Sequence, residues 1–302
     1  NKHLIDKNWD SVLYEFIPKF INAKNNQEYK LVTLELICNI HDTHADIYND
    51  EDIENFRGNR ISALETKFVE NKLVIIDYYK NISTTNLEKG NIIEKVNGIL
   101  VEDIIKEMLP ITHGSNYSTK LREISKRILR TNENNISLLI NRKGLKKELS
   151  IPTFPIEEID QYSYNNLQSN KILKDNVGYI FPGTIKNDEI KDIIDSFKQT
   201  KGLIIDLRCY PSDFIVFSLG NYLVNKPTEF VKFSYTSHSH LGCFKYTEPQ
   251  YVGDTTIQYN KKVAILVNEE TQSNAEYTAM SFEVSSNSKV FGSQTAGADG
   301  NV

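Results

Sequence analysis

Hydrophobic residues recur at three- and four-residue spacing near the start of the chain. Over residues 9–20 this spacing predicts one amphipathic helix, with Asp6 available as its N-cap. Pro18 should stop or bend that helix, because proline cannot donate the backbone hydrogen bond of the helix interior. A second helical pattern covers residues 29–40 and leads directly into polar residues. These polar residues therefore lie at a helix C-terminus or in the loop after it, where functional residues are often found.

From about residue 65 to residue 155 the pattern changes to short β-like runs, polar turns and two helical stretches. The run at 91–96 ends in Asn97-Gly98, and this dipeptide predicts a tight turn because both residues tolerate positive φ. The mixture is typical of a small α+β module. Its expected strands are 73–78, 91–96 and 136–141, and its expected helices are 101–108 and 120–129.

After residue 155, apolar strands alternate with helical stretches, which predicts a parallel sheet with helices covering both faces. In such sheets the functional crevice lies at the carboxyl ends of the strands. Two expected strands end there in polar clusters, one beginning at Asp206 and the other at Asn268. The expected strands are 177–181, 202–207 and 263–267, and the expected helices are 188–199, 214–223 and 275–285.

Composition narrows the function classes. The 302 residues are 39% hydrophobic and 25% charged, which is ordinary for a folded globular protein. A net charge of −5 gives no general attraction to nucleic acid or anionic lipid, so peptides or small molecules are the expected partners. No apolar run approaches the roughly 20 residues of a membrane span. Cys38, Cys209 and Cys243 form no C-x-x-C pair, which argues against a disulfide framework or a cysteine-rich zinc site.

Ser273 falls at an expected strand-to-helix junction. A serine placed there can present its Oγ outward, while N–H groups of the helix N-terminus face a developing oxyanion. Alternatively, Ser273 or Thr271 is simply the N-cap of the helix, and Glu276 completes a capping box. The local pattern by itself favours the cap, because caps are far commoner than nucleophiles.

Four segments in order resemble known motifs. Residues 263–276 resemble the nucleophile segment of peptidase family S41, the C-terminal-processing and tricorn-core serine proteases, with the motif N-x-x-T-x-S-x-x-E after an apolar strand. Residues 202–208 are similar to that family's "glIiDLR" strand, and residues 291–297 to its G-x-x-T-x-G. Residues 87–98 resemble the "kGD-x-I-x-x-x-NG" signature of bacterial PDZ domains, with Asn91 where Asp is usual.

The resemblance implies three parts. Residues 1–64 would be an N-terminal helical segment that carries the catalytic base, and residues 65–155 an inserted α+β PDZ-like domain. Residues 156–302 would be an α/β catalytic domain with ClpP/crotonase-like βα layers. Further strands and an acidic residue are expected after Val302, because family members continue there. The sequence leaves the compartment open, and the resemblance favours an extracytoplasmic one, periplasmic or at the bacterial cell surface.

A serine hydroxyl needs a base to act as a nucleophile. C-terminal-processing proteases place a Lys directly after the last Gly of G-x-x-T-x-G, but this chain has Ala298 there, so a Ser–Lys dyad is not expected. Tricorn-core enzymes use a His from a D-S-H element, which Asp42-Thr43-His44 resembles. The resemblance therefore implies His44 as the base and Thr43 as its supporting hydroxyl. From the residues alone, His44 could also be a helix C-cap, or pair with His41 in an H-x-x-H metal site.

The resemblance also implies an oxyanion hole made by the N–H groups of Asn274 and Ser212. Ser212-Asp213 replaces a Gly-Gly of the family, and side chains narrow the conformations open to that turn. Asp299 and Glu276 are the candidate acids within the chain. Neither a metal nor a cofactor is expected.

Other polar residues have structural interpretations. Asp206 and Arg208 flank the end of an expected buried strand and should brace it through an ion pair. His238 and His240 alternate along a β-like stretch, which predicts a surface strand, with zinc binding as the alternative.

The function expected from these observations is a serine endopeptidase, in which His44 deprotonates Ser273 and a PDZ-like module binds peptide tails. Its partner would be a peptide or protein substrate, with no nucleic acid and no membrane span. The alternative is a catalytically inactive S41-like protein that binds peptides or small molecules.

Overall fold

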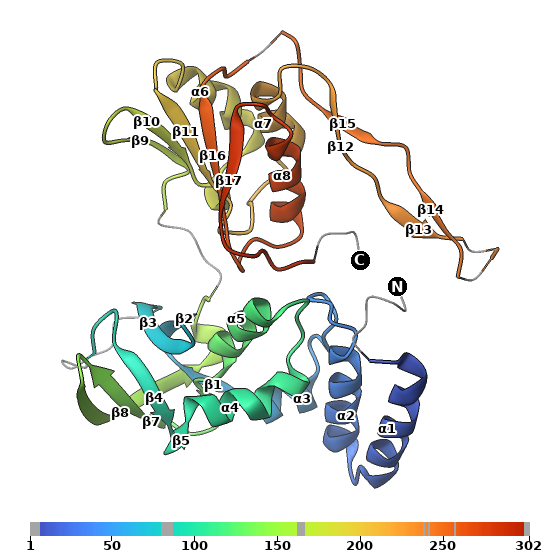
Figure 1. The fold of residues 1–302 in the computed structure, drawn as a ribbon. Helices are drawn as coiled ribbons and strands as arrows, with labels where there is room; N and C mark the ends of the chain where they lie inside the picture. The colour runs from blue at the N-terminus through green and yellow to red at the C-terminus, as the bar shows by residue number, and fades with distance from the viewer. Residues whose placement is uncertain are drawn as a thin grey trace. The chain divides into compact units, whose positions relative to one another are not determined.

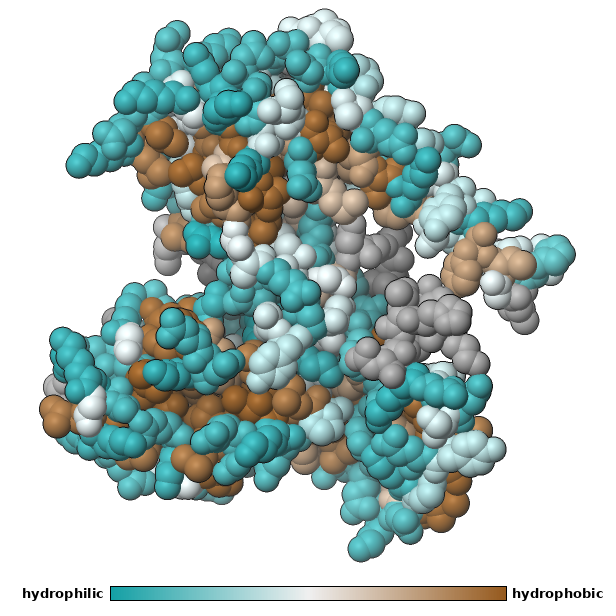
Figure 2. All heavy atoms as spheres, in the orientation of Figure 1, coloured by the Kyte–Doolittle hydropathy of each residue, from teal (hydrophilic) through white to brown (hydrophobic). Residues whose placement is uncertain are grey.

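The computed structural model describes residues 7–79, 87–161, 167–237, 239–240, 242–256 and 258–298 (Figure 1). The chain divides into two compact units, Asn1–Ser163 and Tyr164–Val302, which we describe separately. Within the described residues, no helix combines the length and apolar character needed to cross a membrane. On the face shown in Figure 2, hydrophilic residues cover most of the outer surface of each unit.

The first unit begins with a helical pair, as predicted. Helix α1 (Trp9–Asn22) starts after Asn8, whose side chain accepts from Asp10 N, while Asp6 lies outside the described residues. Of the stop or bend predicted at Pro18, the stop is wrong, because α1 continues four residues beyond it, while a bend stays a prediction. Tyr14, whose carbonyl would have accepted the missing hydrogen bond, is exposed, so its loss is tolerated. Two further helices follow, α2 (Asn26–Cys38) and α3 (Glu51–Arg57).

The rest of this unit is an antiparallel sheet with helices α4 (Val101–Met108) and α5 (Tyr117–Arg127). Its strands run in the order β2-β3-β4-β7-β8-β1-β6, with β5 paired to β4. Asn97 and Gly98 both have positive φ, 48° and 83°, so the predicted hairpin turn is confirmed. The strands are β1 (Arg60–Ser62), β2 (Leu64–Val69), β3 (Lys72–Tyr78), β4 (Ile92–Val96), β5 (Ile99–Leu100), β6 (Arg130–Thr131), β7 (Asn135–Arg142) and β8 (Leu145–Pro155).

Apolar side chains of α5 and the sheet form the core of this α+β part. Ile124 of α5 is fully buried together with Leu73 and Ile75 of β3 and Leu138 of β7. The alternating burial along β7, with every second residue from Ile136 to Ile140 buried, is the pattern of a strand with one covered face. The alternation thus appears in the burial of β7, although its sequence, with Leu138, Leu139 and Ile140 in a row, does not alternate.

The second unit is built on a five-stranded sheet in the order β17-β16-β11-β10-β9. All neighbouring strands are parallel except β9, which runs antiparallel to β10. The predicted parallel sheet is therefore confirmed. Its strands are β9 (Asn170–Leu173), β10 (Val177–Ile180), β11 (Gly202–Asp206), β16 (Lys262–Val267) and β17 (Ser288–Gly292), and its helices are α6 (Ile190–Ser196), α7 (Val216–Leu223) and α8 (Asn274–Glu283).

The core of the second unit lies between this sheet and its helices. Ile205 and Ile265, on neighbouring strands, are fully buried with Leu219 of α7 and Phe282 of α8. This packing fixes where α8 begins relative to the strand ends, because helix and sheet share one set of buried side chains.

A two-stranded ribbon leaves the second unit between α7 and β16, as Figure 1 shows. In it β12 (Thr228–Val231) pairs with β15 (Gln250–Val252), and β13 (Ser234–Thr236) with β14 (Phe244–Tyr246). His240 lies in the turn after β13, so the predicted surface strand is wrong at that residue, and His238 falls outside the described residues. Among the residues that the structure describes, no group of three or more His, Cys, Asp or Glu could hold a metal ion.

Candidate active site

Ser273 stands where the chain passes from the sheet into α8. Strands β11 and β16 are parallel neighbours, with Asp206 opposite Leu266, so their carboxyl ends meet at one edge of the sheet. Ser273 has φ 52° and ψ −115°, whereas an ordinary N-cap residue is extended with negative φ. Backbone strain of this kind is concentrated at functional sites, and it is typical of a nucleophile on a strand-turn-helix. Ser273 is the N-cap of α8 and Glu276 completes a capping box with it, so that alternative is confirmed, and the strained φ is the feature that a cap by itself does not require.

Thr271 joins the strand ends. Its side chain is buried, and its Oγ1 donates to Leu207 O at 2.7 Å and accepts from Asn268 N at 3.0 Å. Its carbonyl accepts from Ala296 N at 2.9 Å. Thr271 is therefore not the N-cap of α8, and the alternative that made it one is wrong. The threonine of the motif instead holds three loops together beneath Ser273.

Glu276 accepts four hydrogen bonds. Its Oε2 accepts from Ser273 N at 3.1 Å and from Ala298 N at 3.0 Å, while its Oε1 accepts from Thr295 Oγ1 at 2.6 Å and Gly297 N at 2.8 Å. The side chain is 7% exposed. Its bond to Ser273 N is the one that a capping box predicts. Because four donors fill both oxygens, Glu276 holds the strained turn and the loop after β17, and it is poorly placed to serve as an acid.

Glu276→Gln should destabilise this arrangement. Both carboxylate oxygens face N–H or O–H donors, so whichever end becomes the amide NH₂ is opposed by backbone donors. We expect a loss of about 2–4 kcal/mol in the free energy of unfolding of this unit, measured by urea titration. Glu283→Gln, on an exposed position of the same helix, is the matched control and should change stability little. Equal stability of the two variants would contradict the bracing role.

Backbone geometry requires glycine at both ends of the G-x-x-T-x-G segment. Gly292 has φ 137°, and a Cβ there would lie 1.8 Å from Val267 O. Gly297 has φ 68° and donates its N–H to Glu276. Ala298 is buried at the position where the related proteases carry a Lys. Asp299, the other candidate acid, lies outside the described residues.

The two predicted oxyanion donors, the amides of Asn274 and Ser212, differ in whether they already have a hydrogen-bond acceptor. Within the described part of the chain, Asn274 N donates no hydrogen bond, as is usual for the first residue of a helix, so this amide is available to a substrate oxygen. Ser212 N donates to Pro182 O at 3.0 Å, and its Oγ also faces Pro182 O at 3.2 Å. The Ser212 amide is therefore already satisfied in this structure, because the turn that replaces Gly-Gly folds onto the residues after β10.

Asp206 and Arg208 form the predicted brace. Arg208 donates to both carboxylate oxygens, from Nε at 2.8 Å and Nη2 at 2.7 Å, and Tyr179 Oη donates to Oδ2 at 2.8 Å. Burial alone would raise the pKa of Asp206, but these donors lower it below its usual value. Burial, and then the neighbouring carboxylate, raises the pKa of Tyr179. The carboxylate stays ionised and holds the end of β11.

His44 lies in the first unit, in the loop between α2 and α3. Helix α2 ends at Cys38 with Asn39 as its C-cap, so His44 is not the C-cap and that alternative is wrong. Its amide donates to Asp42 Oδ1 at 2.8 Å, and its ring Nδ1 lies 3.6 Å from the same oxygen. The ring is 19% exposed. Asp42 therefore fixes the backbone at His44 through the amide, while its carboxylate lies near the ring without a hydrogen bond to it.

Thr43 anchors this loop. Its side chain is 1% exposed, its Oγ1 lies 3.0 Å from Ser115 Oγ, and it accepts from Ser115 N at 3.0 Å. The Thr43 amide donates to Ser115 Oγ at 3.1 Å. These contacts with Ser115, seventy-two positions along the chain, hold the backbone of Thr43 in place, and His44 is the next residue.

Asp46 is a second anchor, which the sequence did not reveal. Its carboxylate, 2% exposed, lies 3.0 Å from Arg57 Nη2, 3.1 Å from Arg127 Nη2 and 3.2 Å from His113 Nδ1. Burial would raise the pKa of Asp46, but these neighbours hold it well below its usual range. No local pattern signals such a cluster, because its members come from three separate segments.

Comparison with known proteins identifies the second unit. Residues 176–301 match the model of peptidase family S41. The chain is similar in fold to the structure of mature CPAF complexed with lactacystin, with a TM-score of 0.70 and 14% identity over 99% of this chain and 81% of that chain. It is similarly related to the crystal structure of mature CPAF, with a TM-score of 0.68 and 14% identity over 99% and 80% of the two chains. No curated protein matches the chain in sequence.

Proposed function

We propose that the chain, whose residues 176–301 match the model of peptidase family S41, is a serine endopeptidase of that family with Ser273 as nucleophile and His44 as general base. One observation carries the proposal. Ser273 has a strained positive φ at the strand-to-helix junction, next to an Asn274 N–H without an acceptor among the described residues. Nucleophile and oxyanion donor are thus adjacent in the chain.

The proposed reaction follows from these roles. His44 takes the proton of Ser273 Oγ as the oxygen bonds to the peptide carbonyl carbon, and Asn274 N–H donates to the resulting oxyanion. The protonated His44 gives its proton to the leaving amine as the C–N bond breaks. Water, deprotonated by His44, then hydrolyses the acyl-enzyme and frees Ser273. A second oxyanion donor at Ser212 would require its N–H to exchange Pro182 O for the substrate oxygen.

Thr43 and Asp42 act in this proposal as positioning residues. Asp42 Oδ1 lies 3.6 Å from Nδ1 of His44, and we propose that a small rotation of the ring lets Nδ1 donate to it, which leaves Nε2 to accept the serine proton. Thr43, bonded to Ser115, limits movement of the loop that carries the ring. The acid predicted at Asp299 stays a proposal, whereas the four bonds of Glu276 favour its bracing role.

We also propose the domain organisation expected from the sequence, with a helical segment at 1–64, a PDZ-like domain at 65–155 and an S41 catalytic domain at 156–302. The antiparallel sheet with α4 and α5 supports a PDZ-like domain, and β1 (Arg60–Ser62) contributes to the same sheet by pairing with β8. Such a domain would bind a peptide tail as an added strand at a sheet edge. The His–Ser subtype would make the enzyme tricorn-like.

A fluorophosphonate probe tests the function, because it forms a covalent bond only with an activated serine. We expect the full chain to be labelled, and peptide mapping by mass spectrometry to place the label on Ser273. Because mature CPAF has been solved with lactacystin, prior incubation with lactacystin should block the label. Absence of labelling in folded protein would favour the alternative, a catalytically inactive peptide- or small-molecule-binding member of the family.

A further inference from the structure

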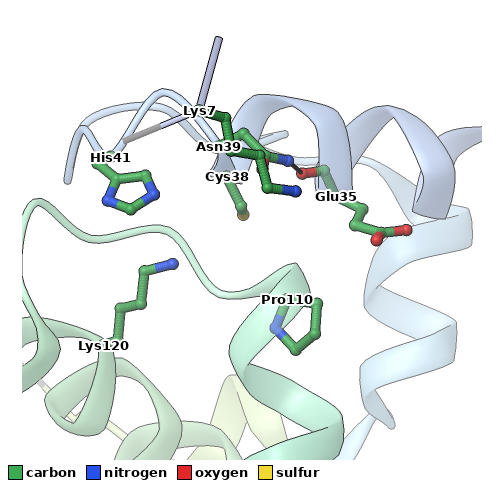
Figure 3. Close-up of a pocket in the computed structure, with 7 residues that line it drawn as sticks. All are labelled: Lys7, Glu35, Cys38, Asn39, His41, Pro110 and Lys120. Carbon is green, nitrogen blue, oxygen red and sulfur yellow. Dashed lines mark hydrogen bonds between the residues drawn. The ribbon is translucent and has the colours of Figure 1, made fainter. Parts of the chain in front are cut away.

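A pocket of about 250 Å³ opens in the first unit. Its wall includes Cys38 at the end of α2, His41 in the loop that follows, Pro110 before α5, and Lys120 on α5 (Figure 3). Figure 3 shows the Lys120 side chain rising from α5 toward the loop of His41, with the Cys38 thiol directed into the same space. Nothing in the proposed peptidase mechanism uses this pocket.

The other charged residues of the lining are paired. Glu35 Oε1 lies 2.6 Å from Lys19 Nζ, and Lys7 Nζ lies 3.0 Å from Glu15 Oε2. Across the residues that the structure describes, no carboxylate lies within ion-pair distance of Lys120. Among the charged residues that line the pocket, Lys120 is therefore the one without an ion-pair partner in the part of the chain that the structure describes.

Burial makes this charge unfavourable. The Lys120 side chain is partly buried, and desolvation lowers its pKa. The neighbouring Cys38 supplies no negative charge, because burial raises the pKa of its thiol to about 12. A desolvated ammonium without a counter-ion is unfavourable until an anion accompanies it.

The C-terminal end of α2 compensates the charge only in part. Helix C-termini carry partial negative charge, which favours a nearby cation. The carbonyls of Leu36 and Ile37, however, already accept from the amides of Asn39 and Ile40, at 3.2 Å and 2.9 Å. Asn39 Nδ2 donates to Glu35 O at 2.8 Å and keeps its second hydrogen for another acceptor. The pocket therefore offers an anion the Lys120 ammonium and one N–H of Asn39 as donors.

We propose that this pocket binds a small oxyanion, a carboxylate or a phosphate, held by the Lys120 ammonium beside His41 and Asn39. The volume accommodates such an ion with some of its water, since a water molecule occupies about 30 Å³. Cys38 and Pro110 provide an apolar side that suits the carbon chain of a short organic acid. This site goes beyond the proposed peptidase function and does not depend on it.

Isothermal titration of the full chain tests the proposal, with inorganic phosphate in one arm and acetate in the other, and chloride at matched ionic strength as the reference. We expect saturable binding of at least one of the two anions, and the arm that binds identifies its class. Lys120→Met should weaken that binding about tenfold or more, because a charge-assisted hydrogen bond is lost. Lys146→Met, which removes a lysine paired with Glu94 on the sheet, is the matched control and should bind as wild type.

A second measurement locates the site in the unaltered protein. Brief reductive methylation with formaldehyde and a borohydride reagent, followed by peptide mapping, should modify Lys120 in buffer, and the bound anion should protect it while Lys146 stays unprotected. Protection of Lys120 supports the proposal even if Lys120→Met fails to fold. No saturable binding of either anion, unchanged affinity in folded Lys120→Met, or no selective protection of Lys120 would each overturn it.

Discussion

Replacing Ser273 by alanine is expected to lower kcat for peptide hydrolysis by about 10⁵-fold or more, as removal of a catalytic serine does in other serine proteases. The variant keeps the amide that donates to Glu276, so its backbone contacts are retained and only the hydroxyl is lost. Release of a fluorogenic peptide product measures the change, and the fluorophosphonate label should disappear with the activity.

Ser293→Ala is the matched control for this prediction. Ser293 is exposed in the loop after β17, and its Oγ makes only a long contact with Glu269 at 3.4 Å. It should keep both turnover and labelling. If Ser273→Ala retained more than about a tenth of the wild-type kcat, far above the residual activity of a protease without its nucleophile, Ser273 could not be the nucleophile.

Replacing His44 by alanine should lower kcat by about 10⁴-fold or more, because the serine loses its proton acceptor. The loss should fall on kcat rather than on KM, since the ring acts on the reacting atoms. Added imidazole should restore part of the activity of His44→Ala and none of that of Ser273→Ala. This rescue separates a missing base from a displaced loop.

His41→Ala provides the comparison within the same loop. His41 lies outside the D-T-H element, and its backbone φ of 57° is compatible with a turn. We expect this variant to keep most of the wild-type kcat. Equal losses in His41→Ala and His44→Ala, with no rescue by imidazole, would indicate that the loop matters only for structure and would remove His44 from the mechanism.

Several elements were predictable because they depend on local periodicity. The apolar runs of β7 and β16 predicted strands, and the unbroken run of β16 follows from the two covered faces of a parallel sheet. The polar clusters after β11 and β16 mark the carboxyl edge of a parallel sheet, so the edge that carries the proposed site was also predictable. The stop at Pro18 failed, because an exposed helix can lose one backbone hydrogen bond to solvent.

Roles that depend on long-range contacts were less accessible. Glu276 has the spacing of a capping residue, and the pattern does not reveal that it also accepts from residues 295–298. The Ser212 amide has the expected position in the motif, yet its acceptor, Pro182 O, is set by the way two loops pack. Both interactions join residues that are far apart in the sequence, and the periodicity of a helix or a strand does not predict such pairs.

The sequence by itself determined the alternation of strands and helices, the edge of the sheet where polar residues collect, and the serine at the junction with α8. These follow from backbone geometry over a few neighbouring residues. Only the tertiary structure decided the strained φ of Ser273, the four donors around Glu276 and the anchoring of the His44 loop by Thr43 and Asp46. Those features arise when segments distant in the chain bury shared polar groups, and each buried group must then find its partner.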